Sequence, residues 1–303
     1  MIVLAGGSGQ IGRMLARHFR DVRVLSRATG WDATALEGAD AVINLAGRSV
    51  DCRYTPENRR AIIDSRVQTT EWIGRAIAGC ARPPRVWLNS STATIYRNSF
   101  DKAMDEWNGE IGEAADAPDT WHFWIDVATK WEAAFFGCDT PATRKVALHS
   151  AMVMSPDQGG VFEVLLRLVR FGLGGAAGSG EQYMSWIHER DFCAAIDLLL
   201  ARDDMDCVVN LASPNPLPNS EFMRELRRAW GIAFGLPASR WMIELGAFFL
   251  RTESELILKS RRVVPTRLLR EGFAFAFPQW PAAARELVAR YSGAPMKMNG
   301  AQK

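Results

Sequence analysis

Three glycines near the start of the chain have the spacing of a phosphate-binding turn. Gly6, Gly9 and Gly12 follow the short apolar run 2–5 and open an amphipathic stretch. The first glycine permits a tight turn, the second lets a phosphate approach the backbone, and the third lets the helix pack on the strand. The N-terminus of that helix adds amide donors and a dipole that favours negative charge. The pattern predicts a dinucleotide pyrophosphate site, and the alternative is a purely structural glycine turn.

The end of the second apolar run predicts which dinucleotide is bound. An NAD site needs an Asp or Glu about 20 residues after the glycines, where it holds the ribose hydroxyls. Here the run ends in Ser26 and Arg27, and the next acid is Asp32. A hydroxyl and a guanidinium suit a 2′-phosphate by charge and by forked hydrogen bonding. We therefore expect NADP(H), unless Arg27 is an ordinary surface arginine.

The elements that must position these residues alternate along the first half of the chain. Short apolar runs are separated by helical patterns, including a helix that starts at Pro56 after the N-cap Thr55 and another over about 120–136. Such alternation is typical of a parallel sheet with crossover helices. We predict an α/β fold, a Rossmann-type doubly wound parallel sheet with a smaller, mainly helical C-terminal part on the substrate side. The predicted strands of the first half are 2–5, 22–25, 41–45, 86–89 and 146–150.

Further motifs accompany the glycine turn along nearly the whole chain. They are Asn44-Leu45-Ala46-Gly47, Asp64-Ser65-Arg66-Val67 with Thr70, Lys130-Trp131-Glu132, the glycines of 172–180 with Gln182, Ser185-Trp186-Ile187-His188, and Val264-Pro265 with Leu268, Gly272, Phe273 and Phe275. In this combination residues 1 to about 290 resemble the atypical extended short-chain dehydrogenase/reductases of the YfcH-like group. That group is called the epimerase family and is described as NAD(P)-dependent and epimerase/dehydratase-like. It carries its own C-terminal helical domain of unknown function.

The resemblance implies cofactor contacts for the residues that match the family's motifs. The residues concerned are Gly6, Gly9, Gln10, Ile11 and Gly12 in the pyrophosphate turn, Ser26 and Arg27 at the adenosine phosphate, Leu45 and Ala46 along the adenosine and ribose path, and Arg66 on its helix.

The resemblance also implies a division of the chain. Residues 1–150 would form the NADP-binding core, to which a strand near 205–212 returns. Residues 151–250 would supply substrate-side segments interleaved with that core, 251–292 the C-terminal helical domain, and 293–303 a tail.

Local patterns predict two more strands in the second half of the chain. Residues 184–187 form one mostly apolar run, and Phe273, Phe275 and Phe277 alternate with a period of two, which predicts a short strand.

The catalytic pair of orthodox relatives is absent. Those enzymes use Tyr-x-x-x-Lys, in which the lysine lowers the pKa of the tyrosine so that it can exchange a proton with the substrate oxygen. If the helix is aligned on Glu132, Trp124 and Ala128 occupy the two positions. If it is aligned on Lys130, Asp126 stands where the tyrosine should be.

Three residues remain as candidates for catalysis. Thr92 matches the hydroxyl that holds the substrate oxygen in orthodox relatives. Tyr96 follows four residues later and would approach the nicotinamide, or else it is a packed aromatic. Asp126 and Lys130 are four residues apart on a helix, so they form either an acid/base pair in the cleft or a solvated ion pair.

Composition excludes several other classes. The chain has 303 residues, 36 Lys and Arg against 34 Asp and Glu, and a net charge of +2, so we expect no nucleic-acid partner. No apolar stretch is long enough for a membrane span, and we expect no membrane association. The five dispersed cysteines fit free thiols rather than a metal site, and we expect a cytoplasmic monomer or homodimer without metal.

Two functions remain in view. The first is an NADP(H)-dependent oxidoreductase or epimerase/dehydratase-like enzyme that acts on an unknown small carbonyl or hydroxyl compound. The second is a non-catalytic NADP(H)-binding sensor or interaction protein. Thr92 and the glycine turn favour the enzyme, towards which we lean, whereas the missing Tyr-Lys pair favours the sensor.

Overall fold

A parallel six-stranded sheet forms the centre of the protein. The computed structural model describes residues 1–26, 30–50, 52–238 and 258–293. The strand order is β2-β1-β3-β4-β5-β9, and each neighbouring pair is parallel. The predicted Rossmann-type fold is confirmed. The strands are β1 (Ile2–Ala5), β2 (Val22–Leu25), β3 (Ala41–Asn44), β4 (Val86–Ser90), β5 (Arg144–Ser150) and β9 (Cys207–Leu211).

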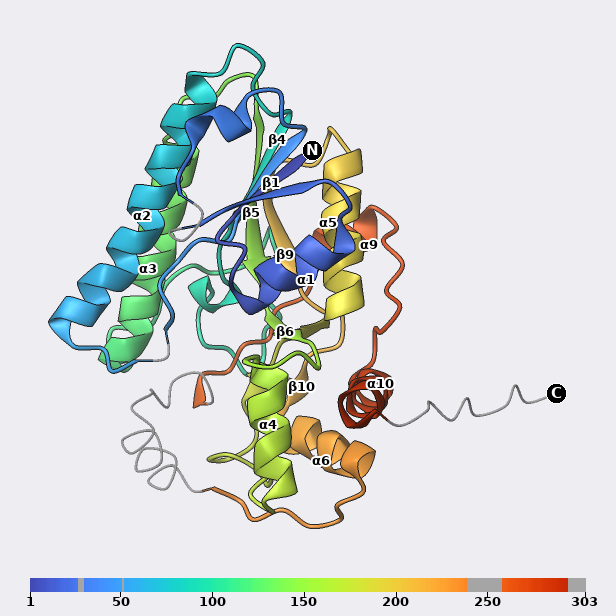
Figure 1. Cartoon of the computed structure of the whole chain (residues 1–303). Helices are drawn as coiled ribbons and strands as arrows, with labels where there is room; N and C mark the ends of the chain where they lie inside the picture. Colours follow the sequence, from blue (N-terminus) through green and yellow to red (C-terminus); the bar gives the residue numbers. More distant parts are fainter. Residues whose placement is uncertain (27–29, 51, 239–257, 294–303) are drawn as a thin grey trace.

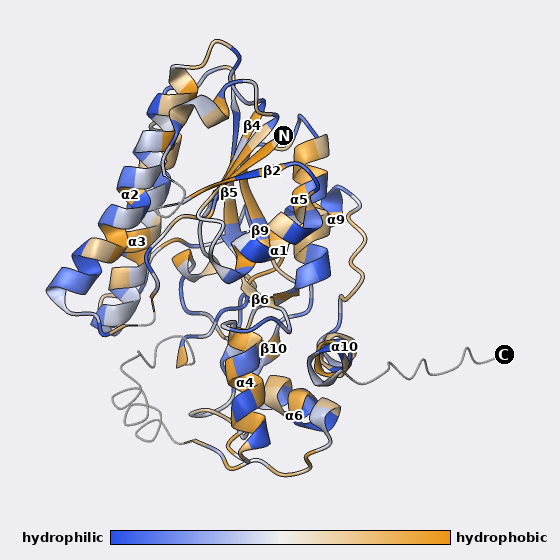
Figure 2. Ribbon diagram, in the orientation of Figure 1, coloured by the Kyte–Doolittle hydropathy of each residue, from blue (hydrophilic) through white to orange (hydrophobic). Residues whose placement is uncertain are grey.

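Helices cover both faces of this sheet (Figure 1). On one face, α1 (Gln10–His18), α5 (Glu189–Ala201) and α9 (Thr266–Arg270) pack on one set of alternating strand residues. On the other face, α2 (Pro56–Ala78) and α3 (Asp119–Phe136) pack on the other set. Successive residues of a strand point to opposite faces, so strands buried on both sides are mostly apolar, and polar residues such as Asn44 and Asn89 stand near their carboxyl ends. Figure 2 shows this as hydrophobic strands between helices with one polar side.

The order of the strands creates a crevice at one edge of the sheet. From β1 the chain passes to β2 on one side, and β3 then pairs with β1 on the other side. Ala5 at the end of β1 is paired with both Leu25 and Asn44, so the loops after all three strands diverge from one place. In open α/β sheets, ligands bind at such a switch point, outside the carboxyl ends of the strands.

A second apolar core lies below the sheet in Figure 1. It joins α4 (Val161–Arg170), α6 (Asn219–Trp230) and α10 (Trp280–Ser292), and Phe222 stacks on Trp280 with ring centroids 3.9 Å apart. Two small sheets connect this part to the large sheet. Their strands are β6 (Met152–Met154) with β8 (Trp186–His188), and β7 (Tyr183–Met184) with β10 (Leu217–Pro218).

Two predictions for the second half need correction. The predicted strand at Phe273–Phe277 is wrong, because the backbone amides of Ala276 and Phe277 donate to the Asp191 carboxylate, at 2.7 and 3.0 Å, instead of joining a sheet. The predicted strand 184–187 is divided at Ser185, whose hydroxyl donates to the carbonyl of Arg261 at 2.7 Å. The returning strand expected near 205–212 corresponds to β9. Residues 239–257 and 294–303, which fall in the expected substrate-side, C-terminal and tail segments, lie outside the described residues.

Two short helices complete the carboxyl edge of the sheet. The 3₁₀ helices η1 (Ala33–Leu36) and η2 (Ala93–Ile95) follow β2 and β4.

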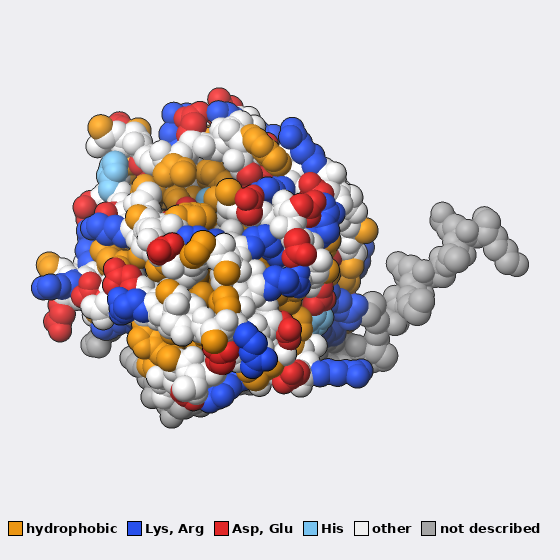
Figure 3. Space-filling view, turned by 90° about the horizontal axis from the view of Figure 1, so that it is seen from above, with side chains coloured by type: hydrophobic (Ala, Val, Ile, Leu, Met, Phe, Trp, Pro, Cys, Tyr) orange, Lys and Arg blue, Asp and Glu red, His pale blue; other side chains and the backbone are white. Residues whose placement is uncertain are grey.

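Charges of both signs are mixed on the surface. Figure 3 shows basic and acidic side chains interspersed over one face of the molecule. Within the described ranges, every helix is too short or too polar to cross a lipid bilayer.

Candidate functional site

The glycine turn, residues 6–12, leaves an open backbone at the switch point. Gly6 has φ +83°, and a β-carbon there would lie 2.6 Å from the Cα of Ala46. A β-carbon on Gly12 would lie 2.5 Å from the Cα of Gly7. A β-carbon on Gly9 would meet only the carbonyl oxygen of Gly6, at 3.9 Å. Packing therefore explains the first and third glycines, whereas the second faces open space of the kind a phosphate needs.

The N-terminus of α1 has unused hydrogen-bond donors. Gly9 is its N-cap, and no side chain caps the first turn. The side-chain nitrogen of Gln10 is buried and has no partner among the described residues. Gly160, the N-cap of α4, lies against Gln10, since a β-carbon there would come within 2.1 Å of that nitrogen. Free amides, the helix dipole and an unpaired buried donor together fit a bound anionic group. Ile11 is half-buried and packs against the core below the turn.

The loop after β2 contains one described residue, Asp32, that bears on the predicted choice of NADP over NAD. Asp32, the first acid after this strand, caps η1 by accepting from the amide of Thr34 at 3.0 Å, and it also accepts from Arg23 at 2.6 Å. The hydrogen bonds from Thr34 lower the pKa of Asp32. This carboxylate is therefore engaged within its own loop. Ser26 is buried and forms a bridge with Gly30. Arg27 lies outside the described residues.

The loop after β3 forms the other side of the crevice. The amide of Ala46 donates to the side chain of Asn44 at 3.0 Å, and Ala46 is buried against the glycine turn. The Asn44 amide group donates in turn to Thr70 at 3.1 Å and to Asn89 at 2.7 Å. These bonds hold the turn after β3 on the neighbouring strand and on α2. Leu45 follows Asn44 and faces a cavity.

This cavity, of about 260 Å³, lies at the carboxyl ends of β3 and β4 and is also lined by residues of α2 and α3. Its size suits a small ligand or one part of a larger one. Its hydroxyl groups come from the end of β4 and the residues that follow it, and its indole rings come from α3. The lining residues are Leu45, Gly47, Val50, Arg66, Ser90, Ser91, Thr92, Thr94, Trp124, Val127 and Trp131.

Arg66 brings a positive charge to the cavity. It donates to the carbonyls of Ile62 at 3.0 Å and Arg48 at 3.4 Å, and its guanidinium lies 5.2 Å from the ring centre of Trp131. Arg66 forms no ion pair with any residue in the described ranges. Burial lowers the pKa of Arg66 to about 10. A desolvated guanidinium without a carboxylate favours an anionic ligand group.

The structure separates the three catalytic candidates. Thr92 lines the cavity and caps η2, accepting from the amide of Thr94 at 3.1 Å, so its hydroxyl hydrogen can point towards a ligand. Tyr96 does not line the cavity and is 4% exposed. Asp126 lies on the exposed side of α3 and pairs with Lys130 at 2.8 Å. Only Thr92 of the three therefore faces the cavity.

The positions of the missing pair are filled by packed side chains. Trp124 and Ala128 are buried on the inner side of α3. Tyr54 and Phe123 surround the Trp124 ring, with centroids 5.5 and 5.4 Å away. The indole nitrogen of Trp124, on the cavity wall, has no partner among the described residues. Trp124 and Ala128 are apolar side chains, apart from the indole nitrogen, and neither exchanges a proton near neutral pH.

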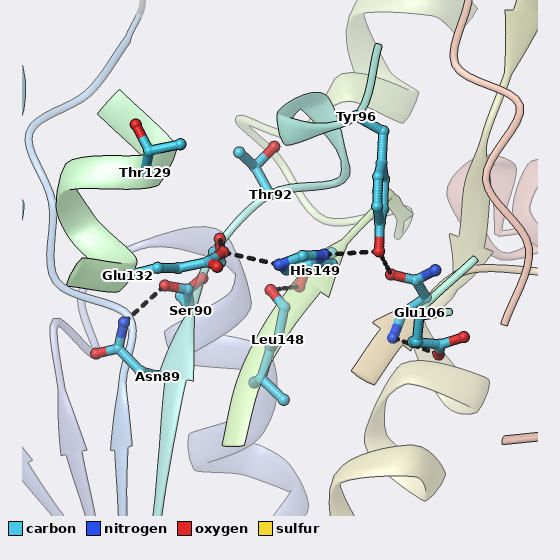
Figure 4. A network of polar contacts seen from close by, with 12 residues as sticks. Asn89, Ser90, Thr92, Tyr96, Glu106, Thr129, Glu132, Leu148 and His149 are labelled. Carbon is cyan, nitrogen blue, oxygen red and sulfur yellow. Dashed lines mark hydrogen bonds and ion pairs between the residues drawn. The ribbon is translucent and has the colours of Figure 1, made fainter. Parts of the chain in front are cut away.

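Sequence reasoning missed a buried polar network behind the cavity, comprising Ser91, Glu132, His149, Tyr96 and Asn210. Ser91 donates to Glu132, which is 2.7 Å from Nε2 of His149. Nδ1 of His149 is 3.0 Å from the hydroxyl of Tyr96, which donates to Asn210 at 2.9 Å. Figure 4 shows Glu132, His149 and Tyr96 in a row.

The network assembles at the same sheet edge as the glycine turn. His149 near the end of β5 is paired in register with Asn210 of β9, and Ser91 directly follows β4. One available signal was that several polar residues stand at strand ends, which meet at one edge in a parallel sheet. Burial raises the pKa of Tyr96, so its hydroxyl keeps its proton. Among the described residues, no cluster of His, Cys, Asp and Glu is suited to a metal ion.

The fold and the carboxyl-edge site together define a class. A doubly wound parallel sheet, a glycine turn at its switch point, and a hydroxyl-bearing strand end beside a long helix are features of the extended short-chain dehydrogenase/reductases.

Comparison with known proteins specifies the family. The chain is 30% identical to the human epimerase family protein SDR39U1 over 304 residues, covering 95% of this chain and 99% of that protein. It is 29% identical to epimerase family protein Mb2239 of Mycobacterium bovis over 296 residues, covering 91% and 93% of the two chains. Residues 238–287 match a domain of unknown function, DUF1731. The chain therefore belongs to the epimerase family, an atypical branch of the short-chain dehydrogenase/reductases.

Solved structures agree with this assignment. A crystal structure of human SDR39U1 (isoform 2) with NADPH superposes with a TM-score of 0.83 at 28% identity and covers 95% of this chain and 98% of that one. A dTDP-4-dehydrorhamnose reductase from Bacillus anthracis, in complex with NADP, superposes with a TM-score of 0.72 at 12% identity, covering 95% and 98% of the two chains. The second likeness concerns the fold alone.

Proposed function

We propose that this chain binds NADP(H) at the carboxyl edge of the sheet and acts as an oxidoreductase or epimerase-like enzyme on a small carbonyl or hydroxyl compound. The observation that carries the proposal is the open face at Gly9 beside the side-chain nitrogen of Gln10, which has no partner in the part of the chain that the structure describes. NADPH in the crystal structure of the human relative supports the same choice. A nicotinamide cofactor, when bound, supplies or accepts the hydride of such reactions.

The residues proposed to hold the cofactor extend along the crevice from the glycine turn to the cavity. Asp32 already accepts hydrogen bonds from Thr34 and Arg23. This acid is therefore not available to hold the ribose hydroxyls of NAD. The proposed contacts are Gly6, Gly9, Gln10, Ile11 and Gly12 for the pyrophosphate, Ser26 and Arg27 for the adenosine phosphate, Leu45 and Ala46 for the adenosine and ribose, and Arg66 for an anionic or hydroxyl group near the cavity.

The proposed substrate site is the cavity beside Thr92. The Thr92 hydroxyl would hold the substrate oxygen, since its own oxygen already accepts the Thr94 amide and its hydrogen is free to donate. The indoles of Trp124 and Trp131 would exclude water from the reacting atoms. Neither Tyr96 nor Asp126 lines this cavity, so a direct proton exchange with substrate is not part of the proposal for them.

A titration with NADPH and NADH, followed by nicotinamide fluorescence, tests the proposal. NADPH should bind at least tenfold more tightly, about 1.4 kcal/mol, and Arg27→Ala should remove the difference. Arg20→Ala is the matched control, because Arg20 is exposed at the opposite, amino end of β2. Absence of binding of either dinucleotide at millimolar concentration would overturn the proposal.

A non-catalytic sensor is the second candidate, favoured by Trp124 and Ala128 at the positions of the missing pair. The two functions differ in hydride transfer. Oxidation of NADPH by any small carbonyl compound, abolished by Thr92→Val, would support the enzyme. NADPH binding that changes self-association or partner binding, with no turnover of a carbonyl panel, would support the sensor.

A further inference from the structure

We propose that Glu132 and His149 hold one exchangeable proton behind Ser91, and that Ser91 passes it to the substrate oxygen in place of the absent Tyr-Lys pair. This inference rests on the proposed function, which places the reacting carbonyl in the cavity. Ser91 lines that cavity, whereas His149 is 1% exposed. Ser91 is then the catalytic residue, and Glu132 and His149 supply and position its proton.

The hydrogen-bond directions fix where the protons lie. The Asn210 side-chain nitrogen donates to the carbonyl of Val264 at 3.0 Å, so its oxygen faces Tyr96 and must accept from that hydroxyl. The Tyr96 oxygen must then accept from Nδ1 of His149, which carries a hydrogen as a result. This leaves Nε2 of His149 facing Glu132 at 2.7 Å.

One further proton must therefore lie between Glu132 and His149. If both were fully deprotonated, Nε2 and the carboxylate would be two acceptors facing each other at 2.7 Å. The pair is instead either imidazolium with carboxylate or neutral imidazole with carboxylic acid, and the proton can move between the two states. Both Nε2 and the Ser91 hydroxyl contact the same oxygen, Oε1 of Glu132.

This arrangement gives a balanced step for carbonyl reduction. The Ser91 hydroxyl donates to Glu132 while no substrate is bound, and in the step it turns its hydrogen to the carbonyl oxygen. It gives up that proton as the carbonyl carbon gains a hydride, and the Ser91 oxygen, now an acceptor, takes a replacement proton from Glu132 and His149. Glu132 is left as carboxylate and His149 neutral with Nδ1 protonated, and a solvent proton restores the pair. The reverse sequence serves oxidation of an alcohol, with Glu132 and His149 as the base.

The surroundings keep the proton on this pair. Tyr96, on the far side of His149, has its pKa raised by burial, and it therefore stays a neutral donor to Asn210. Glu106 and Asp105 also act on Tyr96 from beyond it, and both disfavour its ionisation. The only outlet from the pair through the described hydrogen bonds is therefore Ser91, on the cavity side.

The first test measures the tautomer of His149 in the wild-type protein. The chain has four histidines, so long-range ¹H–¹⁵N spectra can be assigned with His→Gln variants. We expect a protonated Nδ1 in the folded protein, as the hydrogen bonds to Tyr96 and Asn210 require. A neutral ring protonated at Nε2 and not at Nδ1 would overturn the proposal. This measurement needs no variant of Glu132.

The second test uses the charge of the oxidised cofactor. A positive nicotinamide ring beside the cavity would disfavour a proton on the pair, whereas the neutral reduced ring would not. We expect NADP⁺ to release up to about one proton per molecule bound, and NADPH to release measurably less, in weakly buffered solution with a pH indicator. Ser91→Ala should retain this difference while it abolishes turnover.

Glu132→Gln should eliminate the difference in proton release. The matched control is Glu71→Gln, an exposed acid on α2 that pairs with Arg75 and should leave the difference intact. Two results would overturn the proposed proton transfer through Ser91 while leaving dinucleotide binding established. One is proton release that is equal for the two dinucleotides, and the other is a difference that persists in Glu132→Gln. Failure of both dinucleotides to bind would overturn the proposed function and this proton transfer with it.

Discussion

The glycine turn and the buried polar network lie at the same edge of the sheet but depend on different physics. The turn is a continuous segment, and its shape rests on backbone conformation and on the absence of side chains at Gly6, Gly9 and Gly12. The network joins α3 and the ends of three strands, and its members depend on one another for hydrogen-bond partners. Damage to the turn should therefore act through steric conflict, and damage to the network through unpaired buried groups.

The largest expected effect is on stability, and it distinguishes Gly6 from Gly9 in the turn. Gly6→Ala should lower the free energy of unfolding by about 2–5 kcal/mol, because it combines a left-handed φ with a β-carbon 2.6 Å from the backbone of Ala46. Gly9→Ala should change it by less than about 1 kcal/mol, because its β-carbon meets open space. Urea denaturation measures both.

The same pair of variants tests the ligand. Gly9→Ala should weaken NADPH binding at least tenfold, which is about 1.4 kcal/mol of binding free energy. The variant should nevertheless stay folded. Unchanged affinity in folded Gly9→Ala would mean that no phosphate approaches this part of the backbone.

A smaller loss of stability is expected when the network loses one hydroxyl group. Tyr96→Phe leaves the Asn210 oxygen and Nδ1 of His149 without their partner, and it should cost about 1–3 kcal/mol of stability. Tyr183→Phe is the matched control, since Tyr183 is half-buried and Arg262 lies over its ring rather than at its hydroxyl. Equal losses in the two variants would show that the network adds nothing beyond packing of the ring.

A carboxyl group beside the network, that of Glu106, should also give stability a pH dependence that the turn lacks. Burial raises the pKa of Glu106, whose carboxylate accepts the amide of Asn210 at 2.9 Å. Between its unfolded and folded pKa values the folded protein binds more protons, so this group's contribution to stability falls as pH rises through that window. Glu106→Gln should remove this fall, at most about 1.4 kcal/mol per pH unit. Urea titrations between pH 4 and 8 measure it, and a contribution that rises with pH would contradict the assignment.

The smallest effect is expected on the outer side of α3. Asp126→Asn removes an exposed ion pair with Lys130 and should cost roughly 0.2–0.5 kcal/mol. NADPH affinity should stay within about twofold, a change below 0.5 kcal/mol. A loss of more than tenfold in affinity would place this carboxylate in the site, against its position outside the cavity lining.

How far the site could be predicted differs between its two parts. Gly6, Gly9 and Gly12 are three positions apart, and the strand before them and the helix after them are visible as local patterns. Thr92 could likewise be placed at a strand end from the apolar run before it. Glu132 and His149 also stand in predicted elements, but nothing local indicates that they face each other.

The alternating phenylalanines show the same limit for the fold. Phe273, Phe275 and Phe277 have the period of a strand, yet the amides of Ala276 and Phe277 bind the carboxylate of Asp191. Periodicity reports which side chains are buried, whereas the partner of each backbone amide depends on a residue more than 80 positions away.

The sequence by itself determined the alternating strands and helices, the glycine turn and the absence of a Tyr-Lys pair. Those features depend on local backbone preference, apolar period and residue identity, which act over a few neighbouring positions. Only the tertiary structure decided that Asp126 faces outward, that Tyr96 is buried, and that Glu132 meets His149 behind Ser91. Hydrogen bonds between distant segments depend on strand order and register, which bring His149 beside Asn210 and close to α3.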